Sequence, residues 1–209
     1  MIDLYTWTTP NGRKVSIMLE ELGLEYNVHP INIGKGEQFS PEFDKINPNH
    51  KIPAIVDGDG PDGKPITLFE SGAILIYLAE KTKSELLPSN AHGRYAALEW
   101  LMLQMGGIGP MFGQVHHFWK FAKEDVPYAK ERYRNEMLRL YGVLDKRLGE
   151  SEYLAGENYT IADIATYPWV ARFGWHPCDL ADFCNVKAWY DKLSERGAVK
   201  AGMAIPFAE

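Results

Sequence analysis

Two short segments of the chain carry groups that suit the binding of a small peptide. In residues 49–57, Pro53 opens an apolar run. Because proline has no N–H, the backbone groups of Ile52 are left to pair with something other than a strand. In residues 68–74, Glu70 precedes Ser71, a good N-cap whose helix would offer its first-turn amides to an anion. Since Glu70 suits an ammonium, the pattern fits an extended peptide with an α-amino and an α-carboxylate group at one end.

These two segments resemble the glutathione-binding half of the cytosolic glutathione transferases. The similarity is greatest to the branch that contains the bacterial Nu class and the fungal nitrogen-regulator-like proteins. It runs from residue 1 to about residue 195. The matching segments are specific for this family when taken together, whereas each alone would be weak evidence. The segments that carry it are residues 9–12, 34–39, 49–57, 69–73, 106–111, 114–118 and 158–163.

The resemblance implies that the protein stabilises the thiolate of glutathione. A free thiol has a pKa of about 8.5, and hydrogen-bond donors together with a helix N-terminus lower it. The loop at residues 7–13 holds no tyrosine, serine or cysteine, and the resemblance gives the sulfur-facing roles to Thr9 and Asn11. The alternative is that this loop is only a helix start, with proline at the first helical position.

The resemblance also assigns the remaining contacts to glutathione. It implies that Ile52 pairs its backbone with the cysteinyl part, that Pro53 is in the cis form, and that Glu70 and Ser71 hold the γ-glutamyl end. Gln38 follows a glycine-rich turn and has both donors and an acceptor for glutathione, although an ordinary loop glutamine is the alternative.

Two basic residues complete the expected binding site. Within this resemblance, Lys51 is expected to add positive charge near the glycyl carboxylate. The resemblance implies that Arg132 reaches a carboxylate of a second glutathione, a role that suits a forked guanidinium. The alternative for Arg132 is a solvated helix residue that pairs with Glu136 four positions later.

Residues 106–118 are rich in glycine, methionine and aromatic side chains. They are candidates for a bent helix that lines an acceptor site, and plain core packing is the alternative. The pair His116–His117 does not indicate a metal site, because adjacent helical residues point in different directions. The expected acceptor-site residues are Met111, Phe112, Val115 and Phe118.

The composition excludes several classes of function. The chain has 209 residues, 45% of them hydrophobic, and a net charge of −6, which argues against nucleic acid or an anionic membrane as the main partner. No apolar run reaches membrane-spanning length, so we interpret the protein as soluble and cytoplasmic. Cys178 and Cys184 are too few for a disulfide scaffold and lie far from the N-terminal motifs. A catalytic protein cysteine is therefore not expected.

The pattern of apolar residues predicts two domains. Residues 1–82 read as an α/β unit of order βαβαββα, which resembles the thioredoxin-like fold, and a linker follows at residues 83–90. Residues 91–209 read as an all-α domain in which Thr160 and Asp163 imitate a capping box, so we assign Asp163 to folding. The predicted strands are residues 2–6, 26–29, 54–56 and 66–69, and the predicted helices are 12–22, 41–46, 71–81, 92–104, 128–148, 161–173 and 186–196.

The function that the resemblance implies is glutathione-dependent reduction of small disulfide bonds without a protein cysteine. Conjugation of glutathione to soft electrophiles needs the same thiolate and is the first alternative. A non-catalytic, regulatory glutathione-binding module is the second alternative, because fold does not determine function. The resemblance also implies a homodimer.

Overall fold

The computed structural model describes residues 1–206, and these form two compact units. Unit 1 consists of Met1–Ser84 together with the segment that begins at Arg196, and unit 2 is Glu85–Glu195. The division after Ser84 lies within the predicted linker. The second segment of unit 1 differs from the predicted boundaries, which assigned residues 91–209 to the helical domain alone.

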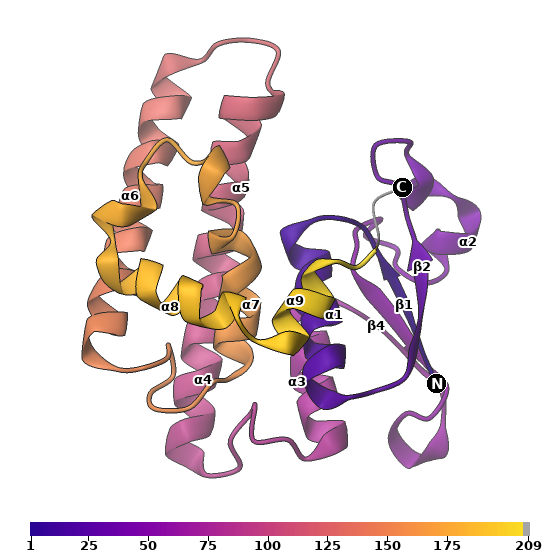
Figure 1. Ribbon diagram of the computed structural model, residues 1–209. Helices are drawn as coiled ribbons and strands as arrows, with labels where there is room; N and C mark the ends of the chain where they lie inside the picture. Colours follow the sequence, from indigo (N-terminus) through magenta and orange to yellow (C-terminus); the bar gives the residue numbers. More distant parts are fainter. Residues whose placement is uncertain (207–209) are drawn as a thin grey trace. The chain divides into compact units, whose positions relative to one another are not determined.

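Unit 1 is built on a four-stranded mixed sheet of order β2-β1-β3-β4 (Figure 1). Strand β1 is parallel to β2, and β3 is antiparallel to both β1 and β4. This arrangement confirms the predicted thioredoxin-like fold and the order βαβαββα. Its elements are β1 (Ile2–Thr6), α1 (Pro10–Leu22), β2 (Tyr26–Pro30), η1 (Glu37–Phe39), α2 (Pro41–Asp44), β3 (Ala54–Asp57), η2 (Pro61–Gly63), β4 (Ile66–Phe69) and α3 (Ser71–Thr82).

The last helix of the chain, α9 (Gly197–Met203), packs against α1 within unit 1 (Figure 1). The two helices approach so closely at Gly202 that a Cβ atom there would lie 2.5 Å from the Cα atom of Ile17. The Ser16 hydroxyl donates to the Gly202 carbonyl at 2.7 Å. Arg196 binds both carboxylate oxygens of Glu21, with Nε–Oε1 at 2.8 Å and a terminal nitrogen–Oε2 at 2.7 Å. Gly202 is therefore required by a close backbone approach and not by a turn.

Unit 2 is helical, as predicted. The structure adds two turns of π-helix, η3 and η4, on either side of α5. Proline at residue 110 lacks the N–H that an α-helix would use, and the wider turn of η3 leaves room for its ring. The elements are α4 (Ala91–Leu103), η3 (Gln104–Ile108), α5 (Gly109–His116), η4 (His117–Phe121), α6 (Pro127–Glu150), α7 (Ile161–Val170), η5 (Phe173–Trp175), η6 (Leu180–Asp182) and α8 (Cys184–Ser194).

A buried carboxylate joins three parts of unit 2. Asp163 forms the predicted capping box with Thr160, the N-cap of α7, whose backbone N–H donates to its Oδ2 atom at 2.9 Å. Its Oδ1 atom accepts from the Leu154 N–H and from the Trp189 indole N–H, both at 3.0 Å. Burial raises the pKa of Asp163, and the donors around it oppose that shift. The prediction that Asp163 forms a capping box at the start of α7 is thus confirmed.

A second buried polar chain crosses the core of unit 2. The Tyr141 hydroxyl lies 2.7 Å from Nδ1 of His176, and Nε2 of His176 lies 2.9 Å from Nε2 of His116. Burial lowers the pKa of His116 to about 4 and that of His176 to about 3. Both rings are therefore neutral at pH 7. The geometry fits a chain in which Tyr141 donates to His176 and His176 donates to His116.

Replacement of Asp163 by alanine is expected to lower the free energy of unfolding by about 3–5 kcal/mol, because several buried donors lose their acceptor. Equilibrium unfolding in urea measures this change. The matched control is Asn90→Ala, which removes an exposed N-cap whose Oδ1 accepts from the Gly93 N–H at 2.8 Å. It is expected to cost about 1 kcal/mol. Equal losses for the two variants would contradict the structural role of Asp163.

Candidate active site

Three segments far apart in the sequence meet at one end of the sheet of unit 1. Tyr5, near the end of β1, pairs with Ala54, the first residue of β3, and Ala54 pairs with Phe69, the last residue of β4. The residues just beyond these pairs therefore emerge side by side. They are Thr9 after β1, Ile52–Pro53 before β3 and Glu70–Ser71 after β4.

Thr9 is the N-cap of α1 and is half-buried. Its Oγ1 atom accepts a hydrogen bond from the Gly12 N–H at 3.2 Å, which leaves the hydroxyl hydrogen available to a ligand. Gly12 permits this turn, because a Cβ atom there would lie 2.4 Å from Oγ1 of Thr6 and 2.5 Å from the carbonyl of Trp7. Asn11 lies in the first turn of α1, also half-buried. The helix-cap interpretation of Thr9 is therefore correct, and it is compatible with a second role as a donor.

In the loop before β3, the backbone N–H and C=O groups of Ile52 are free to bind a ligand. The Ile52–Pro53 peptide bond is cis, as the resemblance implies. Within residues 1–206, neither the N–H nor the C=O of Ile52 has a hydrogen-bond partner. The Ile52 side chain packs in a small cluster with Phe43 and Ala54. Asn47, which the sequence analysis did not single out, is buried and donates from Nδ2 to the carbonyl of Lys51 at 2.6 Å.

Gln38 lies in the short 3₁₀ helix η1. Its side-chain oxygen Oε1 is buried and has no hydrogen-bond partner among the described residues. A buried acceptor without a donor is costly, so this oxygen marks a place where a ligand would supply one. Lys51, in contrast, has an exposed side chain.

The start of α3 differs from the prediction in its cap. The N-cap is Glu70, and Ser71 is the first helical residue, so the prediction that Ser71 caps the helix is wrong. Glu70 has a φ of 71°, in the region that side chains other than glycine rarely adopt. Strain of this kind is typical of functional sites. Ser71 is buried, and its Oγ atom accepts a hydrogen bond from Nζ of Lys14 at 3.3 Å.

Lys14 is a residue of this region that the sequence analysis missed. Its side chain is only 1% exposed, although it is a lysine in the middle of α1. The burial of Lys14 could have been predicted from its spacing. Lys14 lies four residues before Met18 and therefore shares the apolar face of α1.

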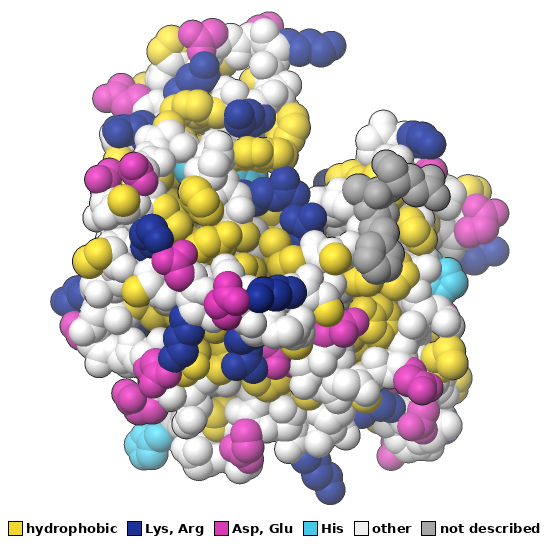
Figure 2. Space-filling view, in the orientation of Figure 1, with side chains coloured by type: hydrophobic (Ala, Val, Ile, Leu, Met, Phe, Trp, Pro, Cys, Tyr) yellow, Lys and Arg dark blue, Asp and Glu magenta, His cyan; other side chains and the backbone are white. Residues whose placement is uncertain are grey.

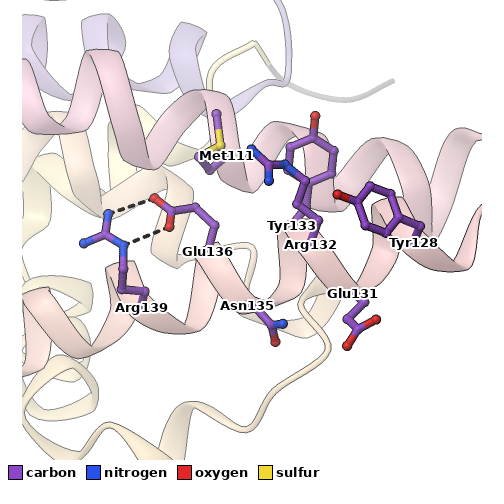
Figure 3. Close-up of a pocket in the computed structure, with 8 residues that line it drawn as sticks. All are labelled: Met111, Tyr128, Glu131, Arg132, Tyr133, Asn135, Glu136 and Arg139. Atoms are coloured by element: carbon purple, nitrogen blue, oxygen red, sulfur yellow. Dashed lines mark hydrogen bonds and ion pairs between the residues drawn. The ribbon is translucent and has the colours of Figure 1, made fainter.

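Unit 2 contains a cavity of about 860 Å³ beside α6, shown in Figure 3. Glu136 is bound by Arg139 through two hydrogen bonds, each of 2.8 Å. Arg132 is exposed, and its charge helps to lower the pKa of Glu136, but the hydrogen bonds of Glu136 are made with Arg139. The Arg132 guanidinium has no hydrogen-bond or ion-pair partner among residues 1–206. The lining residues are Met111, Tyr128, Glu131, Arg132, Tyr133, Asn135, Glu136 and Arg139.

The four predicted acceptor-site residues have different environments. Met111 lines the cavity, and Phe118 stacks on the lining residue Tyr133 with ring centroids 5.5 Å apart. Phe112 and Val115 are fully buried in the core of unit 2. For these two residues the structure thus agrees with the core-packing alternative, because each falls on the inner face of α5.

The two cysteines are free, as predicted, and both belong to unit 2. Cys184 is exposed, whereas Cys178 is half-buried. Burial raises the pKa of the Cys178 thiol to about 11, so it is protonated at neutral pH. In the segments that meet at the end of the sheet there is accordingly no protein thiol.

Two further observations concern the surface. Basic and acidic side chains are interspersed over the face shown in Figure 2, in keeping with a chain of mixed charge. None of the helices among residues 1–206 combines the length and the apolar character needed to cross a membrane.

Comparison with known proteins identifies the family of the chain. The family model of the glutathione S-transferase N-terminal domain matches residues 1–80, and the model of the C-terminal domain matches residues 108–197. The disulfide-bond oxidoreductase YfcG of Escherichia coli is 53% identical over 199 residues, which cover 95% of this chain and 92% of the relative. The disulfide-bond oxidoreductase YghU of the same organism is 41% identical, with 98% and 74% covered.

Solved structures of glutathione transferases are similar to this chain over nearly its full length. A glutathione transferase from Burkholderia graminis, with two glutathione molecules bound per subunit, has a TM-score of 0.94 and 49% identity, and the match covers 100% of this chain and 89% of that one. A glutathione transferase from Pseudomonas putida, with one glutathione disulfide bound per subunit, has a TM-score of 0.94 and 48% identity, with 98% and 91% covered. By both domain models and by relatives of this identity and coverage, the chain belongs to the glutathione S-transferase family.

Proposed function

We propose that this protein is a glutathione-dependent disulfide-bond oxidoreductase. It would reduce small disulfides through bound glutathione thiolates and without a protein cysteine. The observation that carries the proposal is the meeting of Thr9, Ile52 and Glu70–Ser71 at one end of the sheet. The 53% identity to an oxidoreductase named for this reaction supports it.

The dimensions of the site suit glutathione. Neighbouring strands are about 4.8 Å apart, so the step from β1 across β3 to β4 spans about 10 Å. An extended tripeptide is also about 10 Å long. In this orientation the unpaired N–H and C=O of Ile52, next to the cis bond at Pro53, would hold the middle of the peptide.

The ends of the peptide have separate partners in the proposal. Glu70 would bind the ammonium of the γ-glutamyl group, and Ser71 with the first-turn amides of α3 would bind its α-carboxylate. Gln38 would use its unpaired buried oxygen to accept from a ligand N–H. Lys51 would attract the glycyl carboxylate with its exposed ammonium.

The thiolate would lie at the start of α1. The Thr9 hydroxyl and the Asn11 amide are donors suited to sulfur, and the helix N-terminus adds positive potential. Together they would lower the pKa of the glutathione thiol and increase the reactive fraction at neutral pH. No cysteine of the protein is needed for this step.

Arg132 is proposed to bind a carboxylate of a second glutathione. Glu136, its expected partner in the alternative interpretation, is already held by Arg139. The related Burkholderia graminis protein, crystallised with two glutathione molecules per subunit, supports a second binding position.

The reaction takes place in two thiol–disulfide exchanges. The first glutathione thiolate attacks one sulfur of the substrate disulfide, forms a mixed disulfide and releases one substrate thiolate, which takes up a proton. The second glutathione thiolate attacks the glutathione sulfur of the mixed disulfide and releases the other substrate thiolate. Two glutathiones are oxidised to glutathione disulfide, and one disulfide is reduced to two thiols. The homodimer expected for the family is part of the same proposal.

The experiment that tests this function compares two reactions on one preparation. We expect rapid glutathione-dependent reduction of hydroxyethyl disulfide and slow conjugation of chlorodinitrobenzene. The double variant Cys178→Ser/Cys184→Ser is expected to retain disulfide reduction within about twofold of the unmodified protein, because Cys178 is protonated at neutral pH and neither cysteine belongs to the segments that meet at the end of the sheet.

Loss of reduction in the cysteine variant, with the fold retained, would show that a protein thiol takes part. Fast conjugation with little disulfide reduction would instead make the protein a conjugating transferase. Absence of both activities, with glutathione still bound, would favour a binding or regulatory role.

Thr9→Ala and Asn11→Ala test the thiolate site. Each variant is expected to raise the pKa of the bound thiol and to slow turnover by about 10²-fold or less, the effect of one lost donor. The absorbance of the thiolate near 240 nm, followed against pH, measures that pKa. Thr9→Ser keeps both the cap and the hydroxyl and serves as the matched control. Unchanged rates in both alanine variants would remove these residues from the site.

Arg132→Ala tests the second glutathione. We expect the glutathione concentration at half-maximal rate to rise by about tenfold, because one charge-assisted hydrogen-bonded pair is lost. The matched control is Arg134→Ala on the same helix, whose Nε donates to the Pro177 carbonyl at 3.2 Å. Equal effects of the two variants would contradict a specific role for Arg132.

A further inference from the structure

Asn47 is a buried residue of the loop between α2 and β3, and the proposed reaction does not use it. It is only 1% exposed. Its Nδ2 atom donates to the Lys51 carbonyl at 2.6 Å, and its Oδ1 atom accepts from the Asn49 N–H at 2.9 Å. Its own backbone carbonyl accepts from the His50 N–H at 3.0 Å. One residue thus holds the three residues that lead to Ile52.

These hydrogen bonds hold the loop in a strained conformation. His50 has a φ of 54°, in the left-handed region that side chains other than glycine rarely adopt. Strain of this kind persists only where the surroundings impose it. Asn47 contacts the backbone on both sides of this strained residue, at its N–H and at the carbonyl of Lys51. The His50 ring adds an anchor of its own, because Nε2 lies 2.7 Å from Oδ1 of Asp44.

The peptide group between Lys51 and Ile52 transmits this constraint to the proposed site. It is trans, since the cis bonds among residues 1–206 are those that precede Pro53 and Pro206. A trans peptide group is planar and rigid, so its C=O and its N–H point in opposite directions. Because Asn47 binds the C=O, the N–H of Ile52 is directed away from the buried amide. This N–H has no hydrogen-bond partner within residues 1–206.

We propose that Asn47 is a positioning residue for glutathione, because its side-chain amide orients the peptide group through which Ile52 donates to the cysteinyl carbonyl of the ligand. The inference rests on the proposed function, since it specifies how the loop before β3 is prepared for the peptide. It adds a residue that does not touch glutathione and acts through the backbone of Lys51 and Ile52.

Hydrogen-bond polarity explains why asparagine suits this position. The Lys51 carbonyl needs a donor, and the Asn49 N–H needs an acceptor. A side-chain amide supplies both, whereas an ionised carboxylate of the same size only accepts. A hydrogen bond to the carbonyl also polarises the peptide group, which makes the N–H of Ile52 a stronger donor.

Calorimetric titration of the full-length protein with S-methylglutathione tests the proposal, because the sulfur of this ligand does not ionise. Asn47→Asp keeps the size of the side chain and the acceptor for the Asn49 N–H. In its ionised form it has no donor for the Lys51 carbonyl. We expect binding about tenfold weaker than that of the unmodified protein, the effect of one misdirected hydrogen bond.

The matched control is Asn49→Asp, which introduces the same charge into the same loop. The Asn49 side chain is exposed, and only its backbone N–H is used by Asn47. This variant is expected to bind S-methylglutathione within about twofold of the unmodified protein, because an exposed charge is screened by solvent. Thermal unfolding followed by circular dichroism checks that each variant is folded.

A second ligand separates positioning from a general loosening of the loop. This ligand is S-methylglutathione with an ester in place of the amide between cysteine and glycine, so its cysteinyl carbonyl is a poorer acceptor. If Asn47 acts through the N–H of Ile52, Asn47→Asp costs less affinity for the ester than for the amide, because the contact that it misdirects is already weakened. Equal losses for the two ligands would overturn the positioning role.

A measurement on the unmodified protein remains informative if Asn47→Asp does not fold. Nuclear magnetic resonance follows the backbone amide proton of Ile52 and the side-chain amide protons of Asn47 during titration with S-methylglutathione. We expect both to shift downfield together, because the two hydrogen bonds share one peptide group.

Two results would overturn the role of Asn47 and leave the proposed function intact. One is full affinity in Asn47→Asp, and the other is a shift of the Ile52 amide proton without a shift of the Asn47 side-chain protons. No binding of S-methylglutathione by the unmodified protein would overturn the proposed function itself.

Discussion

The pairing of Tyr5 with Ala54, and of Ala54 with Phe69, determines which parts of this chain meet. A shift of one residue in either pair would turn every side chain of that strand to the other face of the sheet. It would also separate the ends of the strands from which the site is built. The chemistry proposed here depends on loops, yet the hydrogen bonds of the sheet set the distance between those loops. Specific side chains then act on a scaffold whose spacing matches an extended peptide.

Much of this architecture could be predicted from the sequence because the signals are local. Alternating apolar residues indicated the first strand, short apolar runs bounded by turn residues indicated the others, and the spacing of Val15, Met18 and Leu19 indicated the first helix. The capping box of Thr160 and Asp163 was visible from residue types alone, and the structure confirms it. The site residues were indicated by resemblance and not by periodicity, because binding loops have no repeating pattern.

The features that escaped prediction depend on contacts between distant segments. Lys14 reads as an ordinary helix lysine until its neighbour Ser71, 57 positions later, is known. The π-turn η3 accommodates Pro110, and the local sequence predicts only that the region bends. Likewise, Phe112 has the composition of a ligand-facing residue, and only its burial against Tyr141 and His176 shows that it is core.

The contact between Gly202 and Ile17 has a consequence for the synthesis of this protein. Helix α1 leaves the ribosome well before α9, the helix that covers Ile17, because all of unit 2 lies between them in the sequence. The packing of unit 1 is therefore incomplete until unit 2 and α9 have been synthesised. During that time an apolar face of α1 remains uncovered, and such surfaces are where chaperones bind and where nascent chains aggregate. Expression of residues 1–84 alone would isolate this unfinished form.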